Sequence, residues 1–123
     1  MQNRLSLKRA YETPAKSDGR RILIDRLWPR GLTKEHAAID EWMKDLAPST
    51  ALRRWFSHDL KKWPEFRRRY KRELAQHSEL LDKLARLASK RRVTLVFSAR
   101  DETHNDAVVL AGVLKTRMKH ISS

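Results

Sequence analysis

The sequence predicts an α/β fold, a small and largely parallel sheet with helices packed on it, in a single domain over residues 1–123. Two aliphatic runs, "RILIDRL" (21–27) and "RRVTLVFS" (91–98), lack a regular alternation with polar residues, as is typical of strands covered on both faces. Other segments repeat apolar residues every three or four positions, which is typical of amphipathic helices. A chain of this length buries about two thirds of its unfolded surface, enough for one core.

The first third of the chain predicts two strands and a short helix. "RLSLKRAY" (4–11) alternates weakly and predicts a strand, and "ETPAKSDGR" (12–20) holds the turn formers of a loop. The run 21–27 then predicts a strand, bounded by Pro29 and Gly31. Thr33 is placed to cap a short helix through "KEHAAI" (34–39), because its hydroxyl can accept free amide hydrogens of the first turn.

The middle third predicts helices. "DEWMKDLAPS" (40–49) is ambiguous and ends at Pro48, after which Ser49 is placed to cap a helix through "TALRRWF" (50–56). The clearest helix runs from Lys62 to about Gln76, with Pro64 tolerated in its first turn. Ser78 is placed to cap the next helix, whose leucines at 80, 81, 84 and 87 form one stripe.

The last third predicts a strand at 91–98 followed by a helix. "ARDETHND" (99–106) leads into that helix, whose apolar residues between 107 and 118 share one face. No repeat or linker divides the chain. Strand, strand, helices, strand and helix in this order predict a largely parallel sheet.

Composition excludes several classes of protein. There is no cysteine, which excludes disulfides and thiolate nucleophiles and suits a reducing cytoplasm. No apolar run approaches the roughly 18 residues of a membrane span, and the N-terminus lacks the apolar core of a signal peptide, so we expect a cytoplasmic protein without a membrane partner. Three glycines cannot build a phosphate loop or dinucleotide fingerprint, so no cofactor is indicated. The net charge of +13 favours anionic partners.

The end of the first aliphatic run is a candidate anion site. Arg26 and Arg30 offer guanidinium donors to phosphate or carboxylate, and the indole of Trp28 offers a stacking face. Ligands of open α/β sheets bind beyond the carboxyl ends of strands. The alternative is structural, with Asp25 pairing with an arginine and Trp28 in the core.

"ARDETHND" is a second candidate, at a strand-to-helix junction. It holds Arg100, Asp101, His104 and Asn105, and His104 is its only side chain that moves a proton near neutral pH. The alternative is that Asp101 or Thr103 caps the helix and His104 is an exposed first-turn residue.

His58 and Asp59 are adjacent between two helices, which permits an acid or base role if the carboxylate orients the imidazole. Neighbouring residues rarely point the right way for this. A metal site would need His58, His104 and a carboxylate brought together by the fold, since no local ligand spacing is present, and we predict none.

The longest basic tract is "KKWPEFRRRYKR" (61–72), which predicts a helix with charged outer faces. Arg67, Arg68, Arg69 and Arg72 are candidates for contacts with a nucleic-acid backbone. The alternative is a solvated basic face, because no helix-turn-helix, zinc or aromatic RNA-binding signature accompanies the tract.

Four segments resemble the YeaO-like family, a bacterial group classified as domain of unknown function 488: "RILIDRLWPRGLTKE", "WMKDLAPSTALRRWFSHD", "WPEFRRRYKREL" and "VTLVFSARDETHNDAVVL". They cover most of the chain. The resemblance implies the fold class and carries no established activity. The family pattern includes the following positions: Asp25, Arg26, Trp28, Pro29, Arg30, Gly31, Lys44, Pro48, Ser49, His58, Asp101, His104 and Asn105.

The leading interpretation is a small enzyme or ligand-binding domain with a cationic pocket for an anionic or phosphorylated small molecule. In it Arg26 and Arg30 hold the anion, Trp28 stacks, and His104 or His58 transfers a proton, with Asp101 orienting the imidazole. Asp25, Lys44, Ser49 and Asn105 complete the expected ligand-binding set. The alternative is a nucleic-acid-binding module using the helix at 61–72; the reaction and the oligomeric state stay open.

Overall fold

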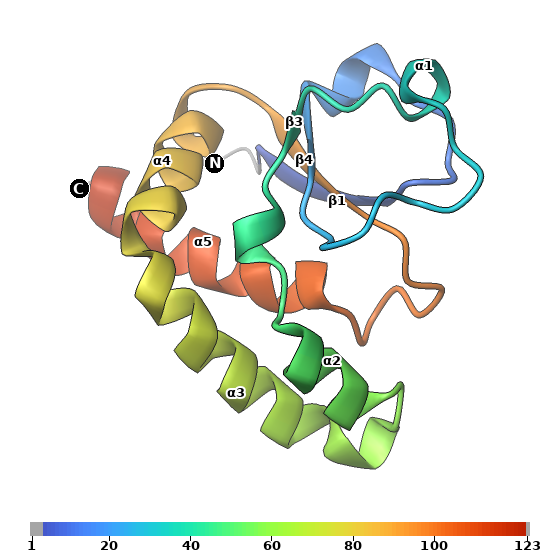
Figure 1. The fold of residues 1–123 in the computed structure, drawn as a ribbon. Coiled ribbons are helices and arrows are strands. Elements are labelled where there is room, and N and C mark those ends of the chain that lie inside the picture. The colour runs from blue at the N-terminus through green and yellow to red at the C-terminus, as the bar shows by residue number, and fades with distance from the viewer. Residues whose placement is uncertain (1–3, 123) are drawn as a thin grey trace.

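The computed structural model describes residues 4–122 and contains a four-stranded sheet in the order β1-β4-β2-β3, with every pairing parallel (Figure 1). The strands are β1 (Leu5–Arg9), β2 (Arg20–Leu23), β3 (Glu41–Trp42) and β4 (Val93–Phe97). The prediction of an α/β fold with a parallel sheet is confirmed.

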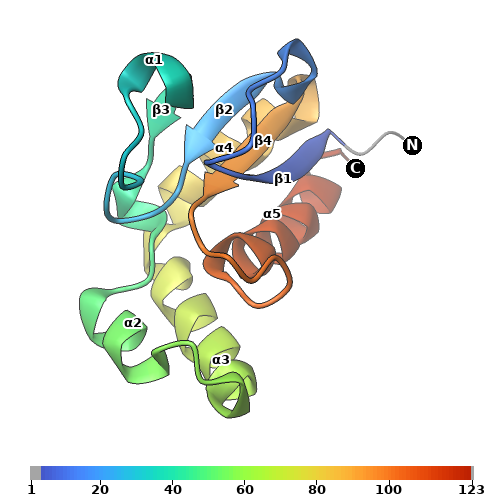
Figure 2. The ribbon, with the colours of Figure 1, turned by 90° about the vertical axis from the view of Figure 1, so that its right-hand side faces the viewer.

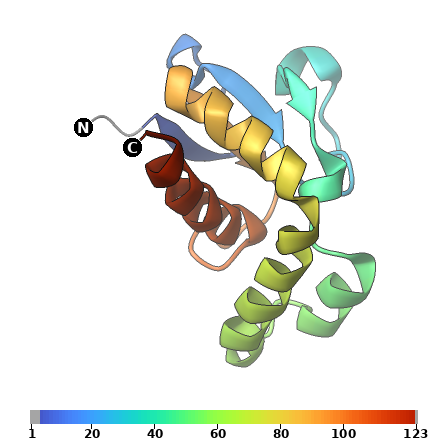
Figure 3. The same ribbon diagram turned by 90° about the vertical axis from the view of Figure 1, so that its left-hand side faces the viewer.

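Five α-helices lie within the described part of the chain. They are α1 (Lys34–Ala37), α2 (Thr50–Phe56), α3 (Trp63–Leu74), α4 (Ser78–Lys90) and α5 (Asp106–Ser122). Helices α4 and α5 pack against each other, and α5 packs on β1 and β4, so both lie on one face of the sheet (Figures 2 and 3). Helices α2 and α3 extend beyond the sheet as a hairpin (Figures 1 and 2).

The main core lies between the sheet and these helices. Strand β4 is buried along its whole length because it has a strand on each side. The opposite face carries a smaller cluster, in which Leu23 and Val96 are covered by the indoles of Trp28 and Trp42. Both faces of the central strands are therefore covered, which explains their unbroken aliphatic pattern.

Arg21 is a charged residue in a buried strand, at 3% exposure. Its guanidinium lies 2.7 Å from the carboxylate of Asp18 and donates to the Ala37 carbonyl at 2.8 Å. Burial alone would raise the pKa of Asp18, but hydrogen bonds from the Ala15 amide, Lys8 and Arg21 hold that pKa below its ordinary value. These bonds satisfy the buried charges and attach α1 to the sheet.

Packed aromatic rings hold the two helices of the hairpin together, and a buried hydroxyl joins the hairpin to the rest of the protein. The rings of Phe56 on α2 and Phe66 on α3 stack with centroids 4.4 Å apart. Tyr70 is fully buried, and its hydroxyl donates to the Leu46 carbonyl at 2.6 Å. Burial raises the pKa of Tyr70 well above its ordinary value, so this hydroxyl stays a donor.

One strand prediction needs correction, and the segment that the sequence left ambiguous is now assigned. The strand expected at 21–27 ends at Leu23, because the chain turns away where the carbonyl of Asp25 accepts a hydrogen bond from the Trp42 indole at 2.6 Å. The ambiguous segment 40–49 contains the two-residue edge strand β3, followed by a short 3-10 turn at Lys44–Leu46. Two residues are too few to show any periodicity in the sequence.

Two of the three capping predictions are confirmed and one is wrong. Thr33 accepts from the His36 amide at the start of α1, and Ser49 accepts from the Leu52 amide at the start of α2, as expected. Ser78 as a cap is wrong, because a 3-10 turn at Ala75–His77 continues α3 into α4 and no side chain caps α4. Two helical segments joined in this way leave no free first turn to cap.

Candidate functional site

A cleft of about 800 Å³ opens at the carboxyl ends of β2 and β4, beside α2. Its polar lining comes from the loops after β1 and β2, from α2 and the turn that follows it, and from the loop between β4 and α5 with the first residue of α5. The polar side chains are Tyr11, Asp25, Arg26, Trp28, Arg30, Thr50, Arg53, Arg54, Ser57, His58, Ser98, His104, Asn105 and Asp106. Both strand ends singled out in the sequence thus line one cleft.

The floor of the cleft is built on Asp25 and Ser98. Leu23 pairs with Val96, so the parallel register brings the residues two positions further along level with each other. One oxygen of Asp25 accepts hydrogen bonds from the Ser98 amide at 2.8 Å and the Ser98 hydroxyl at 2.5 Å. The structural alternative for Asp25 was a pair with an arginine. Asp25 does have a structural partner, but that partner is Ser98.

Asp106 lies on the same floor, in the first turn of α5. Burial raises the pKa of the Asp106 carboxyl well above its ordinary value, and the charge of Asp25 and a hydrogen bond with it raise it further. Both effects favour the neutral, protonated form of Asp106. The neutral form adds no negative charge to the cleft lining.

Four arginines line the cleft: Arg26 and Arg30 after β2, and Arg53 and Arg54 on α2. Arg26 donates to the Pro48 carbonyl, at 3.4 Å. Over residues 4–122, none of the four guanidinium groups forms an ion pair with a carboxylate, whereas Arg21, Arg68, Arg69 and Arg117 all do. Apart from the bond from Arg26 to Pro48, the donors of these four groups are available to an anion.

Trp28 lines the cleft, and contacts with neighbouring residues hold its ring in place. Its ring packs edge-on against Trp42 with centroids 5.5 Å apart, and its Nε1 donates to the Leu32 carbonyl at 2.7 Å. The side chain is half-buried. Both alternatives from the sequence therefore apply, because Trp28 is part of the small core cluster and also presents surface to the cleft.

His104 is oriented by Asp101. Nδ1 of His104 lies 3.0 Å from a carboxylate oxygen of Asp101 and 2.9 Å from the Thr103 hydroxyl, and the ring stands edge-on to Trp63. Both polar contacts use Nδ1, which leaves Nε2 for the cleft. Hydrogen bonds to the Asp101 carboxylate, first from the Thr103 amide and then from the His104 amide and both side chains, lower the pKa of Asp101 to about 2.

His58 reaches the cleft from the turn after α2, without help from Asp59. Its backbone is in the left-handed region, with φ of 59°, and its ring lies beside Phe56. The carboxylate of Asp59 accepts from the Lys61 amide at 3.0 Å instead, and so caps the next turn. The side chain of His58 is exposed, so the chain holds it less firmly than it holds His104.

Three further predicted site residues have structural partners. Lys44 lies outside the cleft lining, with its ammonium 4.2 Å from the centre of the Trp42 ring. Ser49 lies in a smaller hollow and donates to Glu73 through its amide and its hydroxyl. Asn105 lines the cleft and caps α5, accepting from the Val108 amide at 3.0 Å. The cap is therefore Asn105, while Asp101 closes the turn before it.

Seven polar residues of the cleft lining were not predicted as site residues: Tyr11, Thr50, Arg53, Arg54, Ser57, Ser98 and Asp106. A sequence signal was available for Ser98, since it stands one residue past β4 much as Asp25 stands two past β2. No sequence pattern marked Asp106 as a cleft residue, because a carboxylate in the first turn of a helix is common.

Within residues 4–122, no group of three or more histidine and carboxylate side chains is arranged to hold a metal ion. None of the helices in that range is long and apolar enough to cross a membrane.

Comparison with known proteins places the chain in a family. Residues 4–122 match the family described as "Inactive DUF488-N3 subclade". The chain is 46% identical to Uncharacterized protein YeaO of Escherichia coli K12 over 112 residues, which is 91% of this chain and 97% of that protein. It is 38% identical to Uncharacterized protein Rv3073c of Mycobacterium tuberculosis H37Rv over 116 residues, covering 94% and 98%. No solved structure matches significantly. The chain therefore belongs to the YeaO-like family of DUF488 domains.

Proposed function

We propose that this protein is a binding domain for a small phosphorylated organic molecule, and that the cleft is its site. The observation that carries the proposal is the set of four cleft arginines without carboxylate partners among the described residues. A guanidinium binds phosphate through paired, charge-assisted hydrogen bonds. The raised pKa of Asp106 favours its neutral form, which adds no negative charge beside the arginines.

The size and the apolar lining of the cleft favour an organic ligand over a free phosphate ion. A volume of about 800 Å³ falls in the usual range for small-molecule sites and far exceeds the size of one phosphate group. Apolar surface comes from Leu27, Pro29, Phe56 and Phe66, which also line the cleft. An organic moiety would contact these side chains while its phosphate meets the arginines.

Binding is the function supported best, in preference to catalysis. The family is described as an inactive subclade. Neither of two serine hydroxyls near the arginines is bonded to an imidazole, because Ser49 donates its hydroxyl to Glu73 and Ser98 donates its hydroxyl to Asp25. In this proposal Nδ1 of His104 donates to Asp101, so Nε2 of the neutral ring accepts a hydrogen bond from a hydroxyl or amino group of the ligand. A cytoplasmic location belongs to the same proposal, because phosphorylated metabolites are abundant there.

The test is a thermal-shift screen of the purified protein against inorganic phosphate, pyrophosphate, nucleotides and sugar phosphates, followed by calorimetry on each hit. We expect R53Q/R54Q to weaken a hit at least about tenfold, since each lost charge-assisted bond is worth about 1.5–3 kcal/mol. Both residues are exposed, so the fold should be unaffected. The matched control is R86Q/R91Q, which removes the same charge outside the cleft.

Two outcomes would contradict the proposal. One is a panel in which no phosphorylated compound raises the melting temperature. The other is an equal loss of affinity in R53Q/R54Q and R86Q/R91Q, which would attribute binding to net charge and not to the cleft. Turnover of a bound compound would replace the binding role with a catalytic one.

A further inference from the structure

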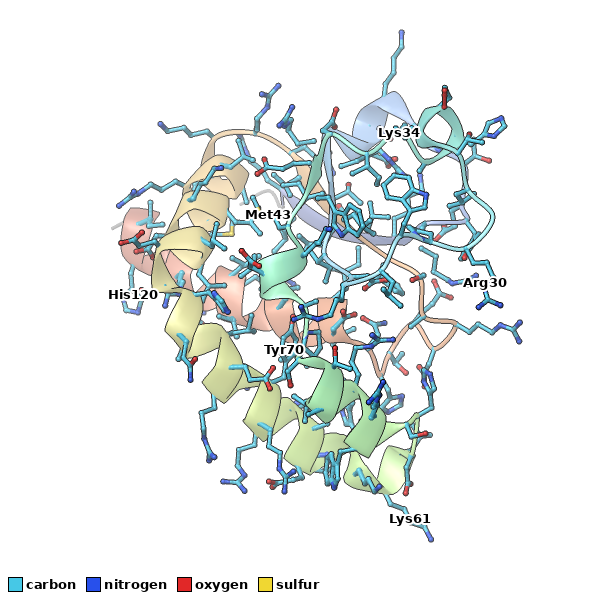
Figure 4. The ribbon with its side chains drawn as sticks, in the orientation of Figure 1. Arg30, Lys34, Met43, Lys61, Tyr70 and His120 are labelled. Atoms are coloured by element: carbon cyan, nitrogen blue, oxygen red, sulfur yellow. The ribbon has the colours of Figure 1, made fainter. Side chains whose placement is uncertain are left out.

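The α2–α3 hairpin holds a disproportionate share of the protein's charge. Residues 50–74, which we name the basic hairpin, contain nine lysines and arginines and three carboxylates, so they carry +6 of the net +13 in about a fifth of the chain. The hairpin extends away from the sheet, and Lys61 points outward at its tip (Figures 1 and 4).

The three carboxylates of the basic hairpin do little to neutralise it. Glu65 pairs with Arg68 at 2.7 Å and with Arg69 at 2.8 Å. Glu73 accepts from Ser49, and Asp59 accepts from the Lys61 amide. Of the three carboxylates of the basic hairpin, only Glu65 thus pairs with cations within residues 4–122, and it pairs with two of them.

The outer face of α3 therefore carries unpaired cations. Arg67, Lys71 and Arg72 are exposed, and over residues 4–122 none of them forms an ion pair. Arg67 and Lys71 are four residues apart, which places them about 6 Å apart along the helix axis. Phosphates of a nucleic-acid strand follow one another every 3.4 Å along the duplex axis, so these cations can contact alternate phosphates.

We infer that the basic hairpin binds the phosphate backbone of duplex nucleic acid, without reading its sequence, at a surface separate from the cleft. This goes beyond the proposed function and does not depend on it. Arg67, Lys71 and Arg72 do not line the cleft. Arg67 and Arg72 belong to the set predicted from the sequence and Lys71 is added to them. Arg68 and Arg69 are left out because both are bound to Glu65.

The geometry favours duplex over single-stranded nucleic acid. Single-strand binders stack bases on exposed aromatic rings. The Trp55 ring contacts two cations of the basic hairpin, with the guanidinium of Arg69 4.2 Å from its centre and the ammonium of Lys62 at 5.0 Å. Its π surface is thus already used by cations of the chain itself.

The geometry disfavours a membrane surface. A helix that lies on a bilayer buries its own apolar face in the lipid. The apolar residues of α3, Phe66, Tyr70 and Leu74, are buried in the protein instead. Only the charged face remains for a partner.

The test measures binding to a labelled random-sequence duplex by fluorescence anisotropy, from about 50 to 200 mM salt, where phosphate contacts weaken steeply. We expect R67Q/K71Q/R72Q to weaken binding at least about tenfold at the lowest salt. The slope of log affinity against log salt should fall by about 2 to 3, close to one per lost contact.

The matched control is R86Q/K90Q/R91Q, which also removes three exposed cations, on and just after α4. We expect its affinity and salt slope to stay within about twofold of the unmodified protein. Circular dichroism should give the same melting temperature for both variants. The phosphorylated-ligand screen on R67Q/K71Q/R72Q should be unchanged, which separates this inference from the proposed function.

Three outcomes would overturn the inference. Equal losses in the two triple variants would mean that net charge alone drives binding. No measurable binding to duplex at the lowest salt would remove the surface altogether. Equal affinity for anionic vesicles, polyglutamate or single strands would show that the surface does not select a duplex.

Discussion

The carboxylate of Asp25 accepts two hydrogen bonds from Ser98, a residue 73 positions away in the chain. The two residues follow the neighbouring parallel strands β2 and β4, so this contact joins the ends of the strands that form the cleft floor. The Asp25 carbonyl is held as well, by the Trp42 indole. The contact thus fixes the point from which the arginine-bearing loop leaves the sheet.

Ser98→Ala should destabilise the protein by about 1.5–3 kcal/mol, the usual worth of a hydrogen bond to a charged group. The amide of residue 98 still donates to Asp25, so the fold should survive. Urea unfolding monitored by tryptophan fluorescence measures the change. Ser57→Ala is the control, because Ser57 is exposed. An equal effect in both variants would mean that the Ser98 hydroxyl contributes nothing.

Asp106→Asn should flatten the dependence of stability on pH. Because the pKa of Asp106 is raised, the folded state binds more protons than the unfolded state between the ordinary value of 3.8 and the raised pKa. The unmodified protein therefore loses stability as pH rises through this window, by up to about 1.4 kcal/mol per pH unit. The variant lacks this loss. Urea unfolding at a series of pH values tests it, and parallel curves for the two proteins would rule it out.

Asp101 should titrate near pH 2, and its hydrogen bonds should be lost at acid pH. Its pKa is lowered to about 2, chiefly by the Thr103 amide, so its stabilising effect is present above 3.8 and disappears as pH falls toward 2. NMR titration of the carboxyl carbon measures the midpoint directly. The His104 amide should shift in parallel, and Asp101→Asn should abolish that shift. A midpoint at 3.8 would disprove the turn geometry.

Gly19→Ala and Gly112→Ala should change stability in opposite directions. Gly19 has φ of 65°, and a Cβ there would collide with the backbone carbonyl of Arg92, so we expect a loss of at least about 1 kcal/mol. Gly112 lies in α5 with open space around it, so alanine should add about 0.5–1 kcal/mol through helix propensity. Thermal unfolding compares the two variants. A neutral Gly19→Ala would contradict the close approach of these backbones.

Local sequence patterns predicted which helices and strands form better than they predicted where each one begins and ends. The spacing of Phe66, Tyr70 and Leu74 predicted α3, and all three side chains are buried as that pattern requires. The strand expected at 21–27 is shorter, because its end depends on contacts of Asp25 with Trp42 and Ser98, both distant in the chain. Ser78 was assigned to a cap because the sequence does not show that two helical segments continue into each other.

Some of the predicted site residues line the cleft, and others lie outside it. Arg26, Arg30 and His104 were predicted from strand ends and line one cleft. Lys44 and Ser49, expected in the same set, lie outside its lining, against Trp42 and Glu73. The assigned roles of these residues stay predictions. Chain position identifies residues near a strand end, but the direction of a side chain depends on the partners it meets.

The sequence by itself determined that aliphatic runs form buried strands, that amphipathic segments pack over them, and that the protein carries a strong positive charge. Periodicity and composition are local or summed properties, so they can be counted along the chain. Only the tertiary structure decided that Asp25, Ser98 and Asp106 share a floor and that four arginines beside them have no carboxylate partner within the described residues. Hydrogen bonds and ion pairs act over a few ångströms between residues far apart in sequence, and folding alone determines which of those residues meet.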